Sequence, residues 1–344
     1  MRTDGFTEDT IRRIAERSER TILDPIVDRW RFRDRRFVPS DPREIRAAVD
    51  DLRKHGVRYD GFAASLDDAE SIETLRQLMM FRALGPHRFA LPLSMAVDEA
   101  YRRAAEMRIG ASEREFPPFE VATYRVPSFY GQPIEFEAWL GNVVNSFGFE
   151  QYFYRSTSAN IRPSLDDVVI DAGAGFGDTA LAFAAAVGPG GKVYSFDPMP
   201  AHQEVFVANA ARNPVLAPRM EFVGRALGDN ADRTLRFKLQ GAGSRFSNDG
   251  DVDVATETID RFVDKGRLTR VDFIKMDIEG AEQMALAGAR NTIARFKPKL
   301  AISIYHSLAD LLAIPELVKS LNPGYRLHLG HYSNHLEETI LYAA

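Results

Sequence analysis

The sequence predicts an α/β fold: a mostly parallel sheet of seven strands with an antiparallel C-terminal hairpin, preceded by a mainly helical N-terminal domain. Three observations support this prediction. Before about residue 150, apolar residues recur at helical spacing. From Val168 onward, strand-like apolar runs alternate with helical stretches, as in parallel strands joined by right-handed crossovers. The first of these strands runs into a turn that is rich in glycine.

Helical spacing covers most of the first part of the chain, in residues 7–36, 41–55, 66–84 and 94–109. Asp41-Pro42-Arg43-Glu44 is typical of a helix start, with a capping carboxylate, an early proline and a glutamate in the first turn. We therefore expect a helical domain over residues 1–115. Residues 116–155 form a bridge dense in aromatic residues, which we expect to pack as core.

Strands and helices alternate in the third predicted domain, residues 156–344. Five strands are expected at 168–172, 193–196, 220–226, 271–276 and 300–305. The helices between and after them are expected at 179–187, 201–213, 280–296 and 308–321. A final antiparallel pair, 325–330 and 338–342, would close the sheet.

The glycine-rich turn follows the strand 168–172 and is typical of a cofactor site. Gly173, Gly175 and Gly177 lack the side chains that would keep a ligand away from the backbone, and glycine tolerates positive φ. The helix that begins at Asp178 presents free N–H groups at its start. This turn is therefore the first candidate for a binding site.

The spacing of the glycines favours one cofactor over another. A dinucleotide fingerprint, G-x-G-x-x-G, would need glycine where the chain has Asp178. The pattern that starts at Asp171, D-x-G-x-G-x-G, is the one expected for S-adenosylmethionine. Asp197 ends the next strand, about twenty residues on, where a carboxylate binds the ribose of either cofactor. A nicotinamide-dependent oxidoreductase therefore remains the alternative to a methyl-transferring enzyme.

Open parallel sheets bind ligands beyond the carboxyl ends of their strands, so the residues at those ends are the candidate contacts. An aromatic ring just before the first strand, at Tyr152 or Tyr154, could attract the sulfonium charge. We predict that the cofactor is bound by Asp171, Gly173, Gly175, Gly177, Asp178, Thr179, Asp197, Pro198, Tyr154, Arg225 and Ala226.

Candidate catalytic residues follow the fourth and fifth strands. Methylation of an alcohol requires a base, and an imidazole has a suitable pKa without perturbation, so His306 is the predicted base. Asp277 is predicted as an alternative base, as an orienting partner of His306, or as an oxygen ligand of Mg²⁺. Glu279, His331 and Arg245 are the predicted substrate contacts.

Several motifs, taken in order, carry a resemblance to a known family. VVIDAGAGFGDTAL, the strand ending in FDP, DFIKMDIEGAE, LAISIYH and ETILYA together resemble the FkbM family of S-adenosylmethionine-dependent methyltransferases. The resemblance covers roughly residues 150–344. It implies a class I, Rossmann-like fold, makes residues 156–344 the S-adenosylmethionine-binding domain, and implies O-methylation of a sugar, glycolipid or small natural-product metabolite. Many relatives have Gly-Ala-Asn-Ile-Gly where this chain has Gly-Ala-Gly-Phe-Gly.

Composition excludes several other classes. The net charge of −5 argues against a nucleic-acid binder, and the absence of cysteine excludes disulfides and thiolate metal sites. No apolar run is long enough to span a membrane, so we expect a cytoplasmic protein acting on a small-molecule or sugar acceptor. The arginine and aromatic stretch at 29–37 is expected to be a salt-bridged surface. A homodimer contact through the N-terminal domain and a non-catalytic binding module remain open alternatives.

Overall fold

A seven-stranded sheet forms the centre of the computed structural model, which describes residues 5–25, 27, 40–117, 119–238, 245–246, 250 and 252–344. The strand order is β15-β16-β14-β13-β6-β7-β8. Only the contacts that β16 makes with β14 and β15 are antiparallel. The strands are β6 (Val168–Ala172), β7 (Lys192–Phe196), β8 (Met220–Val223), β13 (Phe273–Met276), β14 (Lys299–Ser303), β15 (Leu327–His331) and β16 (Thr339–Ala343). The predicted sheet and its terminal hairpin are confirmed.

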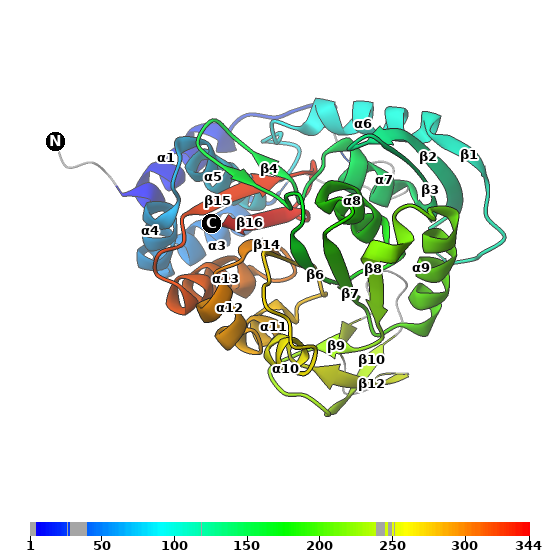
Figure 1. Ribbon diagram of the computed structural model, residues 1–344. Coiled ribbons are helices and arrows are strands. Elements are labelled where there is room, and N and C mark those ends of the chain that lie inside the picture. The colour runs from blue at the N-terminus through cyan, green and yellow to red at the C-terminus, as the bar shows by residue number, and fades with distance from the viewer. Residues whose placement is uncertain are drawn as a thin grey trace.

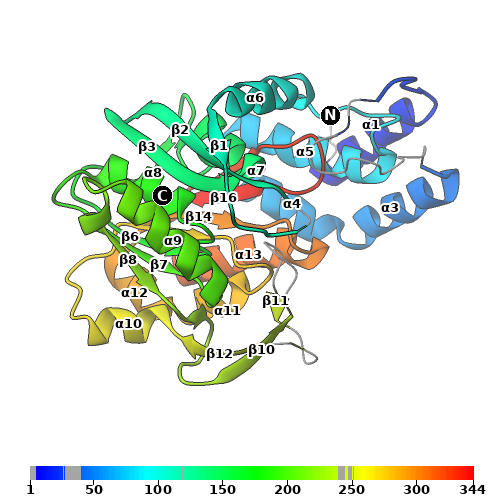
Figure 2. The ribbon, with the colours of Figure 1, turned by 90° about the vertical axis from the view of Figure 1, so that its right-hand side faces the viewer.

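Helices cover both faces of this sheet (Figures 1 and 2). Alternate residues of each strand point to opposite faces, so Ile170 and Ile274 enter one apolar core while Val169 and Phe273 enter the other. The helices of the C-terminal half are α8 (Asp178–Val187), α9 (Pro200–Arg212), α10 (Ile259–Lys265), α11 (Glu282–Ala287), α12 (Arg290–Phe296) and α13 (Leu308–Leu321). Both faces are buried, which explains the nearly continuous apolar strands in the sequence.

The N-terminal part is helical, as predicted. Its helices are α1 (Phe6–Ser18), α3 (Pro42–Lys54), α4 (Gly56–Ser65), α5 (Ala69–Leu84) and α6 (Ser94–Glu106). Asp41 and Glu44 form the expected capping box at the start of α3. Helix α4 was not predicted. The helix predicted over 7–36 ends at Ser18, and residues 19–25 are described but not helical, so the prediction was wrong there, whereas much of 26–39 lies outside the described residues. The arginine and aromatic stretch 29–37 lies there too.

The N-terminal helices attach to the edge strand β15. The Asp67 N–H donates to the Leu327 carbonyl, and the Leu329 N–H donates to Ser71 Oγ. His328 Nδ1 lies 2.7 Å from an oxygen of Asp68, and the His328 side chain is fully buried. These contacts occupy backbone groups that an edge strand would otherwise leave unpaired.

The aromatic bridge forms a sheet that the sequence analysis did not predict. Strands β1 (Arg108–Ala111), β2 (Val121–Phe129) and β3 (Gln132–Trp139) pair antiparallel in that order. The turn between β2 and β3 consists of Tyr130 and Gly131, both with positive φ. The short helix α7 (Leu140–Val143) and the π-helix η1 (Val144–Gly148) follow. This sheet packs with α8 and α9 over one face of the central sheet (Figure 2).

Two element predictions in the C-terminal half were wrong. The strand predicted at 220–226 ends at Val223, and β9 (Ala226–Leu227) joins a separate sheet of order β11-β10-β12-β9. The helix predicted at 280–296 is divided into α11, which ends with Gly288 as its C-cap, and α12, which begins at Arg290. Gly288 lies against the backbone of Gly228, where a Cβ would come within 2.1 Å of the carbonyl oxygen, so this position requires glycine.

The remaining elements are short. They are β4 (Tyr154–Arg155), β5 (Asn160–Ile161), β10 (Thr234–Lys238), β11 (Arg245–Phe246), β12 (Val252–Glu257) and the 3₁₀ helix η2 (Ala217–Arg219). None of the helices in the described part of the chain combines the length and the hydropathy that crossing a membrane requires.

Asn209 of α9 connects the bridge sheet to the glycine turn. Its fully buried amide accepts a hydrogen bond from the Glu137 N–H and donates to the carbonyls of Glu137 and Phe176. We predict that Asn209→Ala lowers the free energy of unfolding by about 2 kcal/mol, because three buried backbone groups lose their partner. Urea unfolding measures this. Val207→Ala, at an exposed position of the same helix, should change stability by less than about 0.5 kcal/mol, and an equal loss in both variants would contradict the prediction.

Candidate functional site

A cavity of about 750 Å³ opens at the carboxyl ends of β6, β7 and β13. This volume lies within the range of roughly 300–1,000 Å³ typical of small-molecule sites. One wall consists of strand ends and the residues that follow them, among them Gly173, Gly175, Asp197, Pro198, Arg225, Ala226, Asp277, Glu279 and His306. The opposite wall comes from α6 and the bridge, with Tyr101, Tyr124, Trp139, Asn142, Ser146 and Tyr152.

The three glycines of the turn are needed for different reasons. A Cβ on Gly173 would lie 1.8 Å from the Asp277 carbonyl oxygen, and one on Gly177 would lie 2.6 Å from the Phe206 ring. Both positions are therefore fixed by packing. Gly175 also has positive φ, but no atom lies within 4 Å of its added Cβ. Only Gly175 combines a bare backbone with open space beside the cavity.

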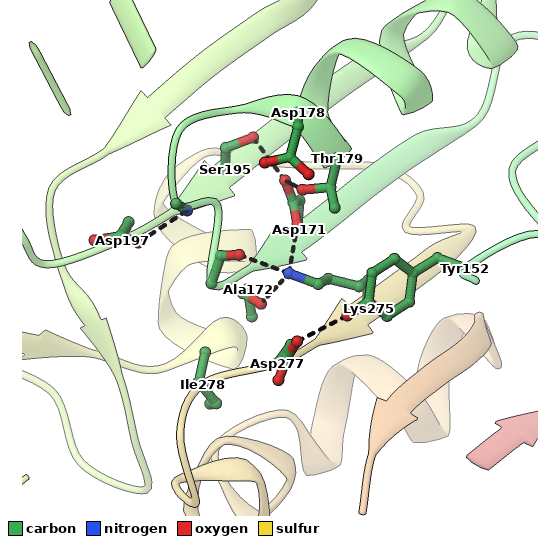
Figure 3. Close-up of polar contacts among 12 residues, drawn as sticks. Tyr152, Asp171, Ala172, Asp178, Thr179, Ser195, Asp197, Lys275, Asp277 and Ile278 are labelled. Carbon is green, nitrogen blue, oxygen red and sulfur yellow. Dashed lines mark hydrogen bonds and ion pairs between the residues drawn. The ribbon is translucent and has the colours of Figure 1, made fainter. Parts of the chain in front are cut away.

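Asp197 anchors the turn from the end of β7. One oxygen accepts the Gly175 N–H at 2.9 Å, and the other accepts the Met199 N–H at 2.9 Å. His202 Nδ1 lies 3.1 Å from both oxygens. Figure 3 shows the Asp197 carboxylate beside the turn, at the predicted position.

Asp171, predicted to contact the cofactor, lies below the cavity and is not among its lining residues. Its carboxylate accepts a hydrogen bond from Thr179 Oγ1 and forms an ion pair with Lys275 (Figure 3). Burial raises the pKa of Asp171, although Lys275 opposes this shift. Thr179 is therefore oriented by Asp171 while it lines the cavity.

Asp178 lines the cavity at the start of α8. It accepts hydrogen bonds from Asn142 Nδ2 at 2.9 Å and from Ser146 Oγ, both in the bridge. Burial raises the pKa of Asp178, and these two donors counteract the shift. Asp178 thus joins the glycine turn to the opposite wall of the cavity.

Asp277, at the end of β13, is surrounded by donors. The hydroxyl of Tyr152 donates to one carboxylate oxygen at 2.8 Å, and the hydroxyl of Tyr305 donates to the other at 3.1 Å. Burial alone would raise the pKa of Asp277, but His306, Lys275 and the Tyr152 hydroxyl hold it well below its usual range. Asp277 is a fixed negative charge, and the prediction that it serves as a base is not supported.

His306 lies between carboxylates on both sides. Its Nε2 is 3.3 Å from Asp277 and 3.7 Å from Glu279, and its Nδ1 is 3.2 Å from Glu282. Burial lowers the pKa of His306, but Asp277 and Glu282 outweigh this effect and raise it to about 11. A ring with so high a pKa is a poor proton acceptor at neutral pH, which argues against the predicted role of His306 as the base. Its distance to Asp277 fits the predicted role of an orienting pair.

Glu279, predicted as a substrate contact, has the properties of a base. It follows the strand end with a positive φ of 56°, and its side chain is 36% exposed at the cavity wall. Burial, together with repulsion from Asp277, raises the pKa of Glu279 to about 7. A carboxyl group that titrates near neutral pH can accept a proton from a bound molecule.

Removing the His306 ring should destabilise the protein, because the carboxylates of Asp277 and Glu282 would lose their counter-charge. We predict that His306→Asn lowers the free energy of unfolding at pH 7 by about 3 kcal/mol. The His306 pKa rises from 6.5 to about 11, so its stabilisation is complete below pH 6.5 and is lost as the pH rises through 11.

Denaturant unfolding between pH 6 and pH 10 tests this prediction. The difference between wild type and His306→Asn should shrink as the pH increases. His55→Asn, at a partly exposed histidine 3.6 Å from Asp51, is the control and should change stability little. A constant difference across the pH range would contradict the assignment of charge to His306.

Comparison with known proteins identifies the part of the chain that carries the glycine turn and Asp277. Residues 171–327 match the family model described as the methyltransferase FkbM domain. This stretch is similar to methyltransferase FkbM domains. No curated protein matches the chain. The bridge residues of the opposite wall, including Asn142 and Tyr152, lie outside the matched residues.

Solved structures resemble the fold. Methyltransferase FkbM from Methylobacillus flagellatus KT has a TM-score of 0.54 and 23% identity, covering 86% of this chain and 60% of that chain. The chain therefore spans three fifths of the length of this neighbour. A precorrin-6y C5,15-methyltransferase from Geobacter metallireducens GS-15 has a TM-score of 0.36 and 13% identity, covering 54% of this chain and 82% of that one. The first similarity shows a class I methyltransferase fold.

Two other predicted contacts, Tyr154 and His331, are not among the residues that line the cavity. Tyr154 stacks on Tyr342 with ring centroids 4.5 Å apart, while Tyr152 takes the place at the cavity wall. His331 is buried against Thr339 and is not among the lining residues, and burial lowers its pKa to about 3. The side chain of Arg245 lies outside the described residues.

The cluster does not fit Mg²⁺. Asp277, Glu282 and His306 each offer an atom within 4.8 Å of the others, as in a metal site. However, the two ring nitrogens of His306 face different carboxylates, Nε2 that of Asp277 and Nδ1 that of Glu282. When the ring is protonated, its N–H groups occupy the space between the ring and each carboxylate, where a metal ion would have to bind. Mg²⁺ prefers oxygen ligands in octahedral geometry. We therefore assign no step to a metal ion.

Proposed function

We propose that this protein transfers a methyl group from S-adenosylmethionine to a hydroxyl of a sugar, glycolipid or small natural-product metabolite. One observation carries the proposal. A single cavity joins the bare backbone of Gly175 and the carboxylate of Asp197 to a second group of acidic residues at Asp277 and Glu279. The first pair fits a nucleoside-containing donor, and the second fits the methylated oxygen.

The residues present fit the donor. Open space beside Gly175 would allow close approach of the amino-acid part of the donor to the backbone. Asp197 stands where a carboxylate accepts hydrogen bonds from a ribose diol. Pro198 and Ala226 would bound the adenine on the same wall. The negative charge of Asp277 would favour the sulfonium of the donor over its neutral product.

The reaction is an in-line displacement in which the bound donor supplies an electrophilic methyl carbon. A bond forms between the acceptor oxygen and this carbon, the carbon–sulfur bond breaks, and S-adenosylhomocysteine leaves. The hydroxyl proton passes to the carboxylate of Glu279. The cavity walls hold the acceptor in line, and such alignment can lower the barrier by several kcal/mol, on the order of 7–11 for ideal geometry.

A radioactive transfer assay tests the proposal. The wild-type protein is incubated with methyl-labelled S-adenosylmethionine and a panel of methyl glycosides, glycolipids and hydroxylated metabolites. We expect the label in an ether methyl group of at least one acceptor, with equimolar S-adenosylhomocysteine. Transfer to amines alone would contradict O-methylation. Hydride transfer to or from NAD or NADP with the same panel would favour the oxidoreductase alternative.

A further inference from the structure

Lys275 and Asp171 form a buried ion pair that the proposed reaction does not use. They occupy paired positions on the neighbouring strands β13 and β6. Lys275 Nζ lies 3.3 Å from an Asp171 oxygen, and the side chains are 2% and 0% exposed. Figure 3 shows the lysine side chain extending beneath the glycine turn.

The ammonium group of Lys275 also donates to two backbone carbonyls. Nζ lies 3.0 Å from the Ala172 oxygen and 2.6 Å from the Gly173 oxygen (Figure 3). These carbonyls stand where β6 ends and the glycine turn begins. The N–H groups of Gly173 and Ala174 both donate to the Phe196 carbonyl of β7. The start of the turn is therefore held on two sides: β7 accepts hydrogen bonds from its N–H groups, and Lys275 donates hydrogen bonds to its carbonyls.

A buried ion pair is an inefficient way to stabilise a fold. Desolvation offsets most of the attraction, so a neutral pair of similar volume often gives equal stability. The specific contribution of Lys275 is geometric, because it directs three donors at Asp171, Ala172 and Gly173. The turn beyond these contacts carries Gly175, whose N–H is held by Asp197 and whose other side is open to the cavity.

We propose that Lys275 is a positioning residue that fixes the glycine turn for the donor, with Asp171 as the counter-ion that keeps its ammonium group in place. This inference rests on the proposed function for the identity of the donor. Lys275 and Asp197 then hold the turn from opposite ends. The donor meets a preformed backbone and does not have to order it on binding.

Four variants distinguish a role of Lys275 in positioning the glycine turn from a role in stabilising the fold. Lys275→Met and Asp171→Asn each leave one buried charge unpaired, so both should lower the Tm. The double variant Asp171→Asn/Lys275→Met has no unpaired charge and should regain most of that loss. Lys299→Met is the matched control, because Lys299 also bonds a carbonyl, that of Arg162, but at the other end of the sheet.

Calorimetric titration with S-adenosylhomocysteine is the first measurement. We expect a Kd about tenfold weaker for Lys275→Met and for the double variant, since both lose the donors to the turn. Asp171→Asn keeps Lys275 and should change the Kd by less than about threefold, and Lys299→Met should leave it unchanged. A double variant with the wild-type Kd would overturn the proposal, as would a Kd that follows the Tm across all variants.

Amide hydrogen exchange of residues 174–177 in the free protein is the second measurement, and it does not depend on the donor. Faster exchange in the double variant than in wild type, with no change in Lys299→Met, supports the proposal. Unchanged exchange overturns it. If the wild-type protein binds no S-adenosylhomocysteine, the proposed function fails, and the exchange result still decides whether Lys275 fixes the turn.

Discussion

We expect Glu279→Gln to reduce the rate of the proposed methyl transfer by about 10²- to 10⁴-fold, the range typical when a general base is lost. The amide keeps the size of the side chain but cannot accept the hydroxyl proton. His306 and Asp277 cannot replace it, because the ring is protonated and the carboxylate is held ionised by its donors. The assay is the initial rate with labelled S-adenosylmethionine and the best acceptor of the panel.

Two controls accompany Glu279→Gln. Glu316→Gln removes a surface carboxylate that pairs with Arg58 far from the cavity and should leave the rate unchanged. In the wild type, kcat/KM should rise with pH through about 7, because the base must be deprotonated. A flat pH profile, or a Glu279→Gln rate within a factor of three of wild type, would show that Glu279 is not the base.

We expect Asp197→Ala to weaken the binding of S-adenosylhomocysteine by about 100-fold. The variant loses the carboxylate that would accept the ribose hydroxyls, and the Gly175 N–H loses its partner. Hydrogen bonds to a charged group contribute about 1.5–3 kcal/mol, and about 2.7 kcal/mol corresponds to 100-fold in Kd. Calorimetric titration measures the change.

Asp197→Asn is the graded control, because its remaining carbonyl oxygen can accept one hydrogen bond, and it should fall between wild type and Asp197→Ala. Thermal unfolding should show that both variants remain folded. Loss of the fold without a specific loss of affinity would argue that Asp197 is structural and that the ribose is bound elsewhere.

Much of the C-terminal half follows from local sequence. Strand β6 and helix α13 have the predicted bounds. The apolar run of β6 ends at a glycine, and the amphipathic repeat of α13 lies between a capping serine and a polar residue. The glycine turn and Asp197 were also placed correctly beside the cavity. Such elements are specified by residues that are close together in the chain.

The bridge sheet depends on contacts that are distant in sequence. The start of β2 is buried on both faces, so Val121 to Tyr124 show no alternation of apolar and polar residues. The Tyr130-Gly131 turn was the available indication of a hairpin, since glycine is common where φ is positive. Pairing of β3 with Asn209 and Asn213, more than 70 residues away, could not be inferred from local spacing.

The protonation states of the candidate catalytic residues also depend on contacts that are distant in sequence. An isolated histidine has a pKa suited to a base, which made His306 the natural choice from sequence. Its neighbours Asp277 and Glu282 come from another loop and helix, and their combined charge reverses that choice. The role of Glu279 depends on the same folded arrangement, because burial and the charge of Asp277 bring its pKa near 7.

The central claim is that the cavity binds the methyl donor, and direct titration tests it. The purified protein is titrated by calorimetry with S-adenosylhomocysteine and, in parallel, with NAD and NADP, each with and without Mg²⁺. We predict binding of S-adenosylhomocysteine alone, unaffected by Mg²⁺. Binding of a nicotinamide cofactor alone would contradict the account, and binding of none of them would favour a non-catalytic module.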